Sequence, residues 1–271
     1  MAEKNKKNEI SFHNKRFKDG RDSRKGFEKF YTITINSQNY FKTEFSRIIN
    51  SKNKLYGSSL VLDYGCGIDA HGLLGTINNS KKPENIFDFY KKHKMQFIGI
   101  DISPEAIKIA KKNAKKINFN ASYKIKNAEN TKFKKNNFDL IFGKGILHHL
   151  NFENCLPELG RILKKDGSCL FFEPMHHNPI IRLGRFFTPQ QRTKDEHPLL
   201  DRDINLFKKY FKTVKYKTFC LTNLFSFLFY KTPLFYFFLN FFNKIDEYLF
   251  KKFPQLKKYG WIIILELKDP Y

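Results

Sequence analysis

Short apolar runs alternate with amphipathic stretches in the central part of the chain. The runs are rich in Val, Ile, Leu and Phe, and they lie at residues 59–65, 96–101, 122–128, 138–143 and 168–174. Two intervening stretches, 105–117 and 153–165, carry apolar residues at helical spacing. This alternation predicts βαβ units and therefore a mostly parallel sheet that is covered by helices on both faces.

The two ends of the chain follow other patterns. Residues 1–25 are polar and charged and predict a loose arm, and residues 27–50 predict a helix that leads into the first strand. Residues 211–221 and 261–268 are the last strand candidates, and an aromatic stretch, 222–258, separates them. Lys231 and Pro233 interrupt this stretch, whereas a membrane-spanning helix needs about 20 uninterrupted apolar residues. We therefore predict a helical cap there.

Composition and charge limit the function classes only in part. The 271 residues suit one elaborated domain, which we place at 51–271 behind an arm and helix at 1–50. Four cysteines without a CxxC pair, and a polar N-terminus, predict a cytoplasmic protein with free thiols. The net charge of +24 fits a nucleic-acid or anionic-membrane partner, but it also fits a general bias toward Lys and Asn. The charge alone does not decide the function.

The segment LVLDYGCGIDAHG carries the first candidate site. Asp63 ends a buried strand, and Gly65 and Gly67 follow it at once. Glycines at such a turn let backbone N–H groups approach a ligand closely. The pattern through Ala70 also fits the dinucleotide fingerprint, although only weakly. Asp63 argues against a pyrophosphate there, because its carboxylate would repel phosphate.

Asp101 ends the next strand, in the segment GIDIS. An acidic side chain at this place can accept hydrogen bonds from both ribose hydroxyls of an adenosine. The alternative is a helix-capping or turn aspartate. Ser103, Pro104 and Glu105 already supply a helix start, which favours a ligand-binding role for Asp101.

Three more segments complete an ordered series of motifs. They are Asn127–Glu129 after the third strand, the stretch FDLIFGKGILHHL around the fourth, and a helix, turn and strand that end at Glu173 and Pro174. Together the five motifs, over about residues 55–175, resemble the class I S-adenosylmethionine-dependent methyltransferases, close to the methyltransferase type 11 (UbiE-like) group. The resemblance implies a Rossmann-like, seven-stranded, mostly parallel sheet with residues 261–268 as an antiparallel edge strand.

The resemblance also implies roles for individual residues. Gly65 and Gly67 would lie against the methionine part of the cofactor, with Asp63 near its amino group. Asp101 would hold the ribose while Ile102 packs on the adenine. Ala128 and Glu129 would border the adenine, and Gly143 and Lys144 would line the cofactor through their backbone.

The sequence departs from the family pattern at several places. The third glycine expected after Gly67 is Asp69, and Asn127 stands where an aspartate is usual. Asp63 and Asp101 are 38 positions apart, whereas about 20 is usual for a nucleotide-binding unit. We assign the excess to an inserted helix and loop at about 76–94. The usual Pro-Gly-Gly turn reads Lys165–Gly167. These departures affect the shape of the cofactor loop more than its binding logic.

Histidines are the candidate catalytic residues. His148 and His149 follow the fourth strand, and His197 lies in the segment after the fifth. A histidine can act as a general base near neutral pH. The alternative is that one of the pair faces the core or caps the next helix. Many methyl transfers need no strong base, because the methyl donor is already activated and positioning does most of the work.

Residues 173–203 are the candidate substrate segment, because the crevice at the C-terminal ends of the strands takes ligands in open sheets of this kind. Arginine is scarce in this Lys-rich chain, yet this segment holds Arg182, Arg185, Arg192 and Arg202, and we assign the first three to the substrate site. Their planar guanidinium groups suit carboxylate or phosphate. Glu196 and His197 complete the predicted substrate site. The alternative is that the arginines only pair with nearby acidic side chains.

The sequence therefore predicts a methyltransferase that uses S-adenosyl-L-methionine, without a metal, on O or N of a small or lipid-linked anionic acceptor. The arm and the 222–258 cap would cover the active site, and Lys residues around the cap would favour peripheral contact with an anionic membrane. We do not expect a nucleic-acid substrate, because no Asn/Asp-Pro-Pro-Tyr/Phe motif follows the fourth strand. An NAD(P)-dependent oxidoreductase and a non-catalytic RNA-binding protein remain the alternatives.

Overall fold

A seven-stranded sheet forms the centre of the computed structural model, which describes residues 2–18, 28–68, 94–188, 193 and 196–271. The strand order is β3-β2-β1-β4-β5-β7-β6. The strands are β1 (Ser59–Tyr64), β2 (Met95–Asp101), β3 (Ser122–Ile125), β4 (Phe138–Lys144), β5 (Leu163–Pro174), β6 (Phe211–Phe219) and β7 (Ile262–Pro270). β1 to β5 pair in parallel and β7 pairs antiparallel to β5 and β6, which confirms the Rossmann-like, mostly parallel sheet that the resemblance implied.

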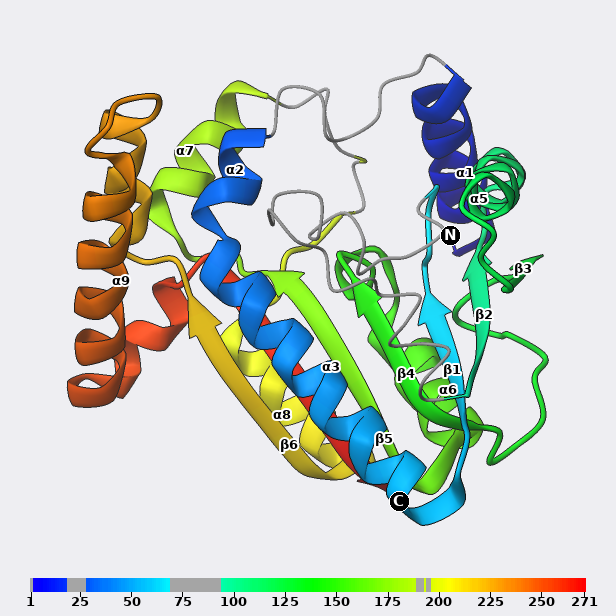
Figure 1. Cartoon of the computed structure of the whole chain (residues 1–271). Helices are drawn as coiled ribbons and strands as arrows, with labels where there is room; N and C mark the ends of the chain where they lie inside the picture. The colour runs from blue at the N-terminus through cyan, green and yellow to red at the C-terminus, as the bar shows by residue number, and fades with distance from the viewer. Residues whose placement is uncertain (1, 19–27, 69–93, 189–192, 194–195) are drawn as a thin grey trace.

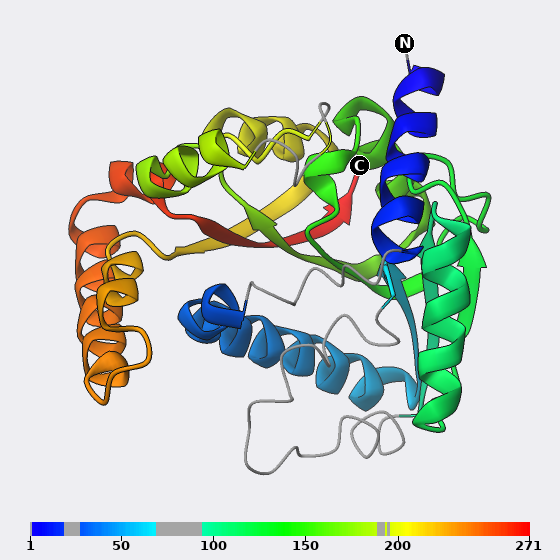
Figure 2. The ribbon, with the colours of Figure 1, turned by 90° about the horizontal axis from the view of Figure 1, so that it is seen from above.

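Helices cover both faces of this sheet. The α-helices are α1 (Ala2–Lys18), α2 (Glu28–Ile33), α3 (Ile35–Tyr56), α5 (Pro104–Lys116), α6 (Phe152–Ile162), α7 (Pro179–Phe187), α8 (Asp201–Tyr210) and α9 (Phe235–Lys252). Three 3-10 helices are η2 (Leu147–His149), η4 (Asn223–Phe229) and η5 (Pro254–Tyr259). Seen from above, the sheet lies between α3 on one side and α8 on the other (Figure 2).

Burial of the central strands explains their continuous apolar runs. Every residue of β4 from Phe138 to Gly143 is buried, because β1 and β5 flank the strand and helices cover it on both faces. One core cluster packs α6 and α8 against the sheet through residues such as Leu156 and Phe207. A second cluster packs α3 and α5 on the opposite face through residues such as Phe45 and Ile107.

The placement of β7 corrects one prediction. β7 pairs with β5 and with β6, antiparallel to both, so the last strand is antiparallel as expected but is not the edge. β6 is the edge strand instead. β7 pairs with two strands that precede it in the sequence, β5 and β6. Such a pairing between distant segments cannot be predicted from the local sequence pattern.

The N-terminal segment corrects a second prediction. Residues 2–18 form the helix α1 rather than a loose arm. α1 lies beside α5 (Figure 1). Its sequence is too polar to show an apolar face, so tertiary contacts determine its helical state.

The predicted turn at Lys165–Gly167 falls inside β5. Phe138 of β4 pairs with Leu163, but Leu140 pairs with Ser168, so the residues between them leave the regular register. The Lys52 ammonium donates to the Asp166 carboxylate at 2.8 Å and ties this irregular part to α3.

The aromatic stretch forms η4, α9 and η5, which confirms a helical arrangement there. η4 and α9 pack on α2 at the β6–β7 side of the sheet, and η5 packs on α9 and β6. Figure 1 places α9 away from the ends of β1 and β2. We expected the cap to cover the active site, but it does not lie over the part of that site that the glycine turn forms. Among the described helices, none combines the length and apolar character that crossing a membrane requires.

Candidate active site

The turn after β1 lies over the end of β2. The N–H groups of Gly65 and Cys66 both donate to the carbonyl oxygen of Ile100, at 2.9 and 2.8 Å. Gly65 and Gly67 have φ values of +78° and +56°, in the left-handed region that favours glycine. These contacts bring the glycine turn next to Asp101.

Asp101 is held by backbone donors on two sides. Its carboxylate accepts the Gly67 N–H at 3.0 Å and the Ser103 N–H at 2.8 Å. Ser103 caps α5 by accepting the Ala106 N–H, so Asp101 does not cap that helix. A carboxylate has about four acceptor positions, so Asp101 retains acceptor capacity beyond its two N–H donors. Ile102, beside it, is half-buried, as packing on a ring would require.

Burial raises the pKa of Asp101, against the opposing effect of the two N–H donors and of the nearby charges of His13 and His149. Asp63 is buried at the end of β1. Burial, followed by the charges of Asp63 and Asp101, raises the pKa of the Cys66 thiol, so both carboxylates lie close to this turn.

The glycines of the site differ in what surrounds them. A Cβ on Gly65 would lie 2.6 Å from the Ile146 side chain, and one on Gly143 would lie 2.8 Å from the Tyr64 carbonyl oxygen. A Cβ on Gly67 would meet no atom of the described residues within 4 Å. Internal packing therefore requires glycine at Gly65 and Gly143, whereas the described residues leave space at Gly67 that suits a ligand.

Contacts with β1, with Asn151 and with α1 hold the loop after β3 in place. The hydroxyl of Tyr64 donates to the Ala128 carbonyl. The Glu129 carboxylate accepts the Asn151 N–H at 2.9 Å and pairs with Lys6 of α1 at 2.9 Å. Lys144 turns its ammonium toward the Phe172 ring, 5.3 Å from the ring centroid, so its backbone is the part that remains near the turn.

His148 and Glu173 form the central buried pair at the ends of β4 and β5. Nδ1 of His148 lies 2.7 Å from Oε2 of Glu173. The other Glu173 oxygen accepts the N–H groups of Ile146 and Leu147, each at 2.9 Å. A carboxylate at Nδ1 favours the tautomer with the proton on Nδ1, which leaves Nε2 as an acceptor. Burial and the charge of His149 lower the pKa of His148, against the effect of Glu173 and Glu196.

His149 contacts the N-terminal helix. Its Nδ1 lies 3.4 Å from the Glu9 carboxylate, which also pairs with His13 at 3.1 Å and accepts the Thr193 hydroxyl at 2.6 Å. Burial opposes the charged form of His149, but Glu9, Glu196 and Glu173 outweigh it and raise the pKa of His149. The ligand atoms of Glu9, His13 and His149 lie within 4.8 Å of one another, a donor set that a divalent metal would accept.

The predicted substrate residues meet the histidines in part. Arg185 of α7 pairs with Glu196 at 2.8 Å, and Glu196 lies 3.9 Å from Nε2 of His148. Arg182 is exposed on α7. The His197 N–H donates to the His148 carbonyl, and its ring packs on Phe152. Arg192, Asp69 and residues 76–93 of the predicted insertion lie outside the described residues.

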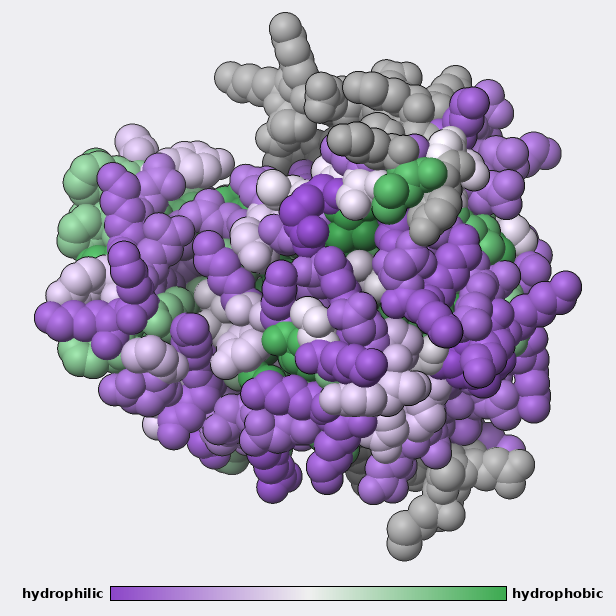
Figure 3. Space-filling view, turned by 90° about the horizontal axis from the view of Figure 1, so that it is seen from below, coloured by the Kyte–Doolittle hydropathy of each residue, from purple (hydrophilic) through white to green (hydrophobic). Residues whose placement is uncertain are grey.

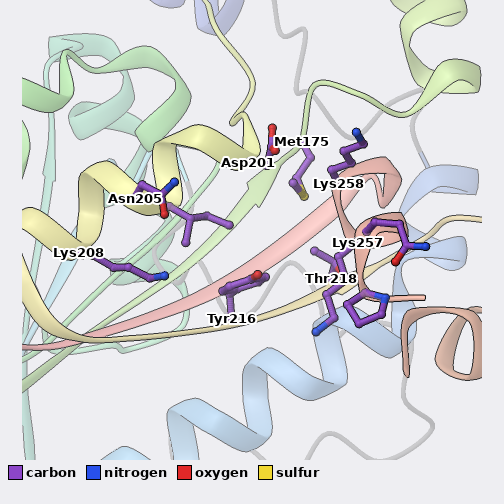
Figure 4. Close-up of a pocket in the computed structure, with 11 residues that line it drawn as sticks. Met175, Asp201, Asn205, Lys208, Tyr216, Thr218, Lys257 and Lys258 are labelled. Carbon is purple, nitrogen blue, oxygen red and sulfur yellow. The ribbon is translucent and has the colours of Figure 1, made fainter. Parts of the chain in front are cut away.

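A separate pocket of about 340 Å³ opens on the α8 side of the molecule (Figure 4). Lys208, Lys257 and Lys258 line it together with Asp201 and Tyr216. Its β6 wall lies five strand positions from β2, or about 24 Å at the usual strand spacing. It is therefore distinct from the Asp101 site.

Sequence reasoning missed three residues of the site. Glu9 and His13 went unnoticed because α1 was not predicted, although their spacing places both on one face of a helix. Glu173 was noted only as the end of a strand. The available signal was its position: Glu173 is an acidic residue at the end of a predicted buried strand, and the preceding strand in the chain is followed by two histidines.

A family comparison decides what this constellation belongs to. The model of a family described as "Methyltransferase domain" matches residues 57–212. This chain belongs to the methyltransferase domain family. The match spans β1 to the start of β6 and so includes the glycine turn, Asp101 and the histidines.

An uncharacterised protein of Methanocaldococcus jannaschii is 30% identical over 151 residues, which are 54% of this chain and 51% of that protein. The chain thus spans about half the length of this relative.

Among solved structures, geranyl diphosphate C-methyltransferase of Streptomyces coelicolor, in complex with Mg²⁺, geranyl diphosphate and S-adenosyl-L-homocysteine, matches with a TM-score of 0.50 at 11% identity. The match covers 78% of this chain and 73% of that one. A Haemonchus contortus phosphoethanolamine N-methyltransferase matches at 0.49 and 18%, over 78% and 49%. A protein of Pyrococcus horikoshii matches at 0.49 and 15%, over 90% and 99%. At these identities the likeness concerns the fold.

Proposed function

We propose that this chain is an S-adenosyl-L-methionine-dependent methyltransferase that acts on O or N of a small or lipid-linked, anionic acceptor. The observation that carries the proposal is the joint geometry of the glycine turn and Asp101. Backbone donors orient the Asp101 carboxylate, and Gly67 beside it leaves open space. A nucleoside with two ribose hydroxyls fits this acceptor group.

The described residues fit the cofactor in the roles that the family resemblance implies. Asp101 would accept from the ribose, Gly67 would allow close approach, and Ala128 with Glu129 would border the adenine. When bound, S-adenosyl-L-methionine supplies a methyl group that its sulfonium already activates. The chain itself then has to position the acceptor and receive its proton.

His148 is the base we assign to this second task. Glu173 holds its Nδ1 at 2.7 Å, which directs Nε2 toward the Arg185–Glu196 pair of the substrate segment. Nε2 would accept the proton that an acceptor hydroxyl or amine loses when it is methylated. Because burial lowers the pKa of His148, its ring is neutral and able to accept a proton near pH 7.

Arginines give the proposal its anionic acceptor. Arg182 and Arg185 lie on α7, and Arg185 contacts the carboxylate of Glu196, which lies beside His148. An incoming carboxylate or phosphate could replace Glu196 as the partner of Arg185. His149 and His197 remain further candidates for contact with the acceptor.

A methyl-transfer assay tests this proposal. The chain would be incubated with methyl-labelled S-adenosyl-L-methionine and with separate small-molecule, lipid, protein and RNA fractions of a cell extract. We expect label in a small-molecule or lipid product that anion-exchange resin retains. Label confined to RNA or protein would contradict the acceptor class. Tight binding of NADH without binding of S-adenosyl-L-methionine would favour the oxidoreductase alternative.

A further inference from the structure

Helix α7 exposes apolar side chains rather than burying them. None of its residues is buried, and Leu183, Phe186 and Phe187 are 60, 75 and 69% exposed. A surface helix of a globular protein normally turns such residues toward the core. Among the described residues, nothing covers the face of α7 that carries these three side chains.

The segment 223–259 carries a second set of exposed apolar side chains. Leu228 of η4, Leu234 before α9, and Tyr236, Phe237 and Phe241 of α9 are all exposed. Most of the large apolar side chains that are exposed in the described residues lie either here or on α7. We call these two segments, 179–187 and 223–259, the apolar platform.

A small core cluster joins the two parts of the platform. Leu224, Phe235 and Leu239 pack inward on Ile33 of α2, and Ile181 of α7 packs on the same cluster. Figure 1 shows α7, α2 and the turn before α9 at the end of the molecule where β4 and β5 terminate. The opposite end, seen in Figure 3, is mostly hydrophilic.

Basic side chains accompany the exposed apolar ones. Lys and Arg outnumber Asp and Glu by eight to two in the platform segments. Lys231, Lys244, Lys251 and Lys252 are exposed, and one of the two acidic residues, Asp246, is buried. Two copies of such a basic face would repel each other, so a second copy of this chain is a poor occupant. Aromatic rings with lysines instead suit the boundary of an anionic bilayer.

The platform is also connected to the candidate active site. Arg185, a platform residue, pairs with Glu196, which lies 3.9 Å from His148. A headgroup at the bilayer surface would thus reach the arginines of α7 before it reaches the histidine.

We propose that the apolar platform docks this protein on the surface of an anionic bilayer and that the acceptor is presented there on a lipid. This inference rests on the proposed methyltransferase function and names its substrate class. The aromatic side chains enter the interface, and the lysines bind lipid phosphates, so the attachment is peripheral and sensitive to salt.

Vesicle sedimentation tests docking separately from catalysis. Full-length protein is mixed with vesicles of phosphatidylcholine, with or without phosphatidylglycerol, at low salt and at about 1 M NaCl, where the Debye length is about 3 Å. We expect binding to the anionic vesicles at low salt, and a loss of about tenfold or more in high salt or without phosphatidylglycerol.

Matched variants locate the surface. Phe237→Ser with Phe241→Ser should lower vesicle binding about tenfold, whereas Leu55→Ser with Tyr271→Ser, at least as exposed but outside the platform, should not. Lys244→Glu with Lys251→Glu should lower binding more than Lys111→Glu with Lys115→Glu on α5. Each variant is also titrated with S-adenosylhomocysteine, which we expect to bind as it does to the wild type.

The outcomes separate the two proposals. Wild-type protein that binds S-adenosylhomocysteine but stays in the supernatant with every vesicle would overturn the docking proposal alone. Vesicle binding by a protein that binds no S-adenosylhomocysteine would overturn the methyltransferase proposal and leave docking in place. A dimer that the Phe237→Ser and Phe241→Ser pair converts to a monomer, without vesicle binding, would assign the platform to self-association.

Discussion

Single residues of the glycine turn carry different tasks, although the sequence presents them as one motif. Gly65 is required by its φ of +78° and by Ile146, whereas Gly67 combines a positive φ with open space. The sequence motif shows only that glycine occupies both positions. Which of them meets a ligand follows from neighbours such as Ile146, which lie far away in the sequence.

Gly67→Val therefore tests ligand approach more cleanly than Gly65→Val. We expect Gly67→Val to lose most S-adenosylhomocysteine affinity at a strain cost of about 1–3 kcal/mol in unfolding free energy. Gly65→Val should cost a further 1–3 kcal/mol or so, because its side chain overlaps Ile146. Titration calorimetry and denaturant unfolding measure the two effects.

Gly57→Val is the matched control for backbone strain. Gly57 has a φ of +70° with nothing within 4 Å of an added Cβ, and it caps α3. It should show the strain cost with full cofactor affinity. Normal affinity in the Gly67→Val protein would mean that the turn has only a structural role.

His148 should control the acidic limb of the pH–rate profile. His148→Gln should lower kcat about 10²–10⁴-fold, the usual contribution of a general base. Activity of the wild type should fall as the pH falls through the lowered pKa of His148, because the protonated ring cannot accept a proton.

Two neighbours should move that limb in opposite directions. Glu173→Gln removes a charge that raises the pKa of His148, so the limb should move to lower pH. His149→Asn removes a charge that lowers it, so the limb should move to higher pH. If neither substitution moves the acidic limb of the pH–rate profile, His148 is not the titrating group.

Whole elements were predictable where burial shapes the sequence. The central strands and α5 and α6 follow their apolar patterns closely, because their side chains must fill both faces of the sheet. α1 was missed because its contacts are polar: Lys6 with Glu129, Glu9 with His149, and Asn14 with Ser103. The position of β7 between β5 and β6 depends on pairing at long range, which a local pattern does not encode.

The docking of α1 should depend on pH through Glu9 and His149. The pKa of His149 is raised in the folded protein. Its stabilisation of the docked helix α1 is therefore complete below pH 6.5, its ordinary pKa, and is lost as the pH rises through the raised pKa. The pKa of Glu9 is lowered from 4.5, against the effect of burial, by hydrogen bonds from His13, His149 and Thr193. Its contribution is present above 4.5 and is lost only in stronger acid.

Hydrogen exchange of the α1 amides measures this docking. After correction for the intrinsic pH dependence of exchange, protection of α1 should be greatest between pH 4.5 and 6.5 and should weaken at higher pH. Glu9→Gln should remove most of the pH dependence. Protection in the wild type that does not fall as the pH rises above 6.5 and through the raised pKa of His149 would contradict the role of this pair.

The net charge of +24 did not by itself indicate a function. The fold distributes that charge: lysines accompany the exposed aromatic side chains of the platform, and the candidate site gathers Glu9, Glu129, Glu173 and Glu196 with histidines. The fold class followed from the sequence. The His148–Glu173 pair did not, because only the adjacency of β4 and β5 brings these residues together.

Titration of the wild type and of Asp101→Ala with S-adenosylhomocysteine tests whether Asp101 binds the cofactor. We expect the wild type to bind one molecule per chain, and the variant to bind more weakly by about 1.5–3 kcal/mol, the scale of hydrogen bonds to a charged group. Unfolding of the two proteins in denaturant controls for a change in stability. Equal affinity in both proteins, or no binding to the wild type, would contradict the assignment of the glycine turn and Asp101 as the cofactor site.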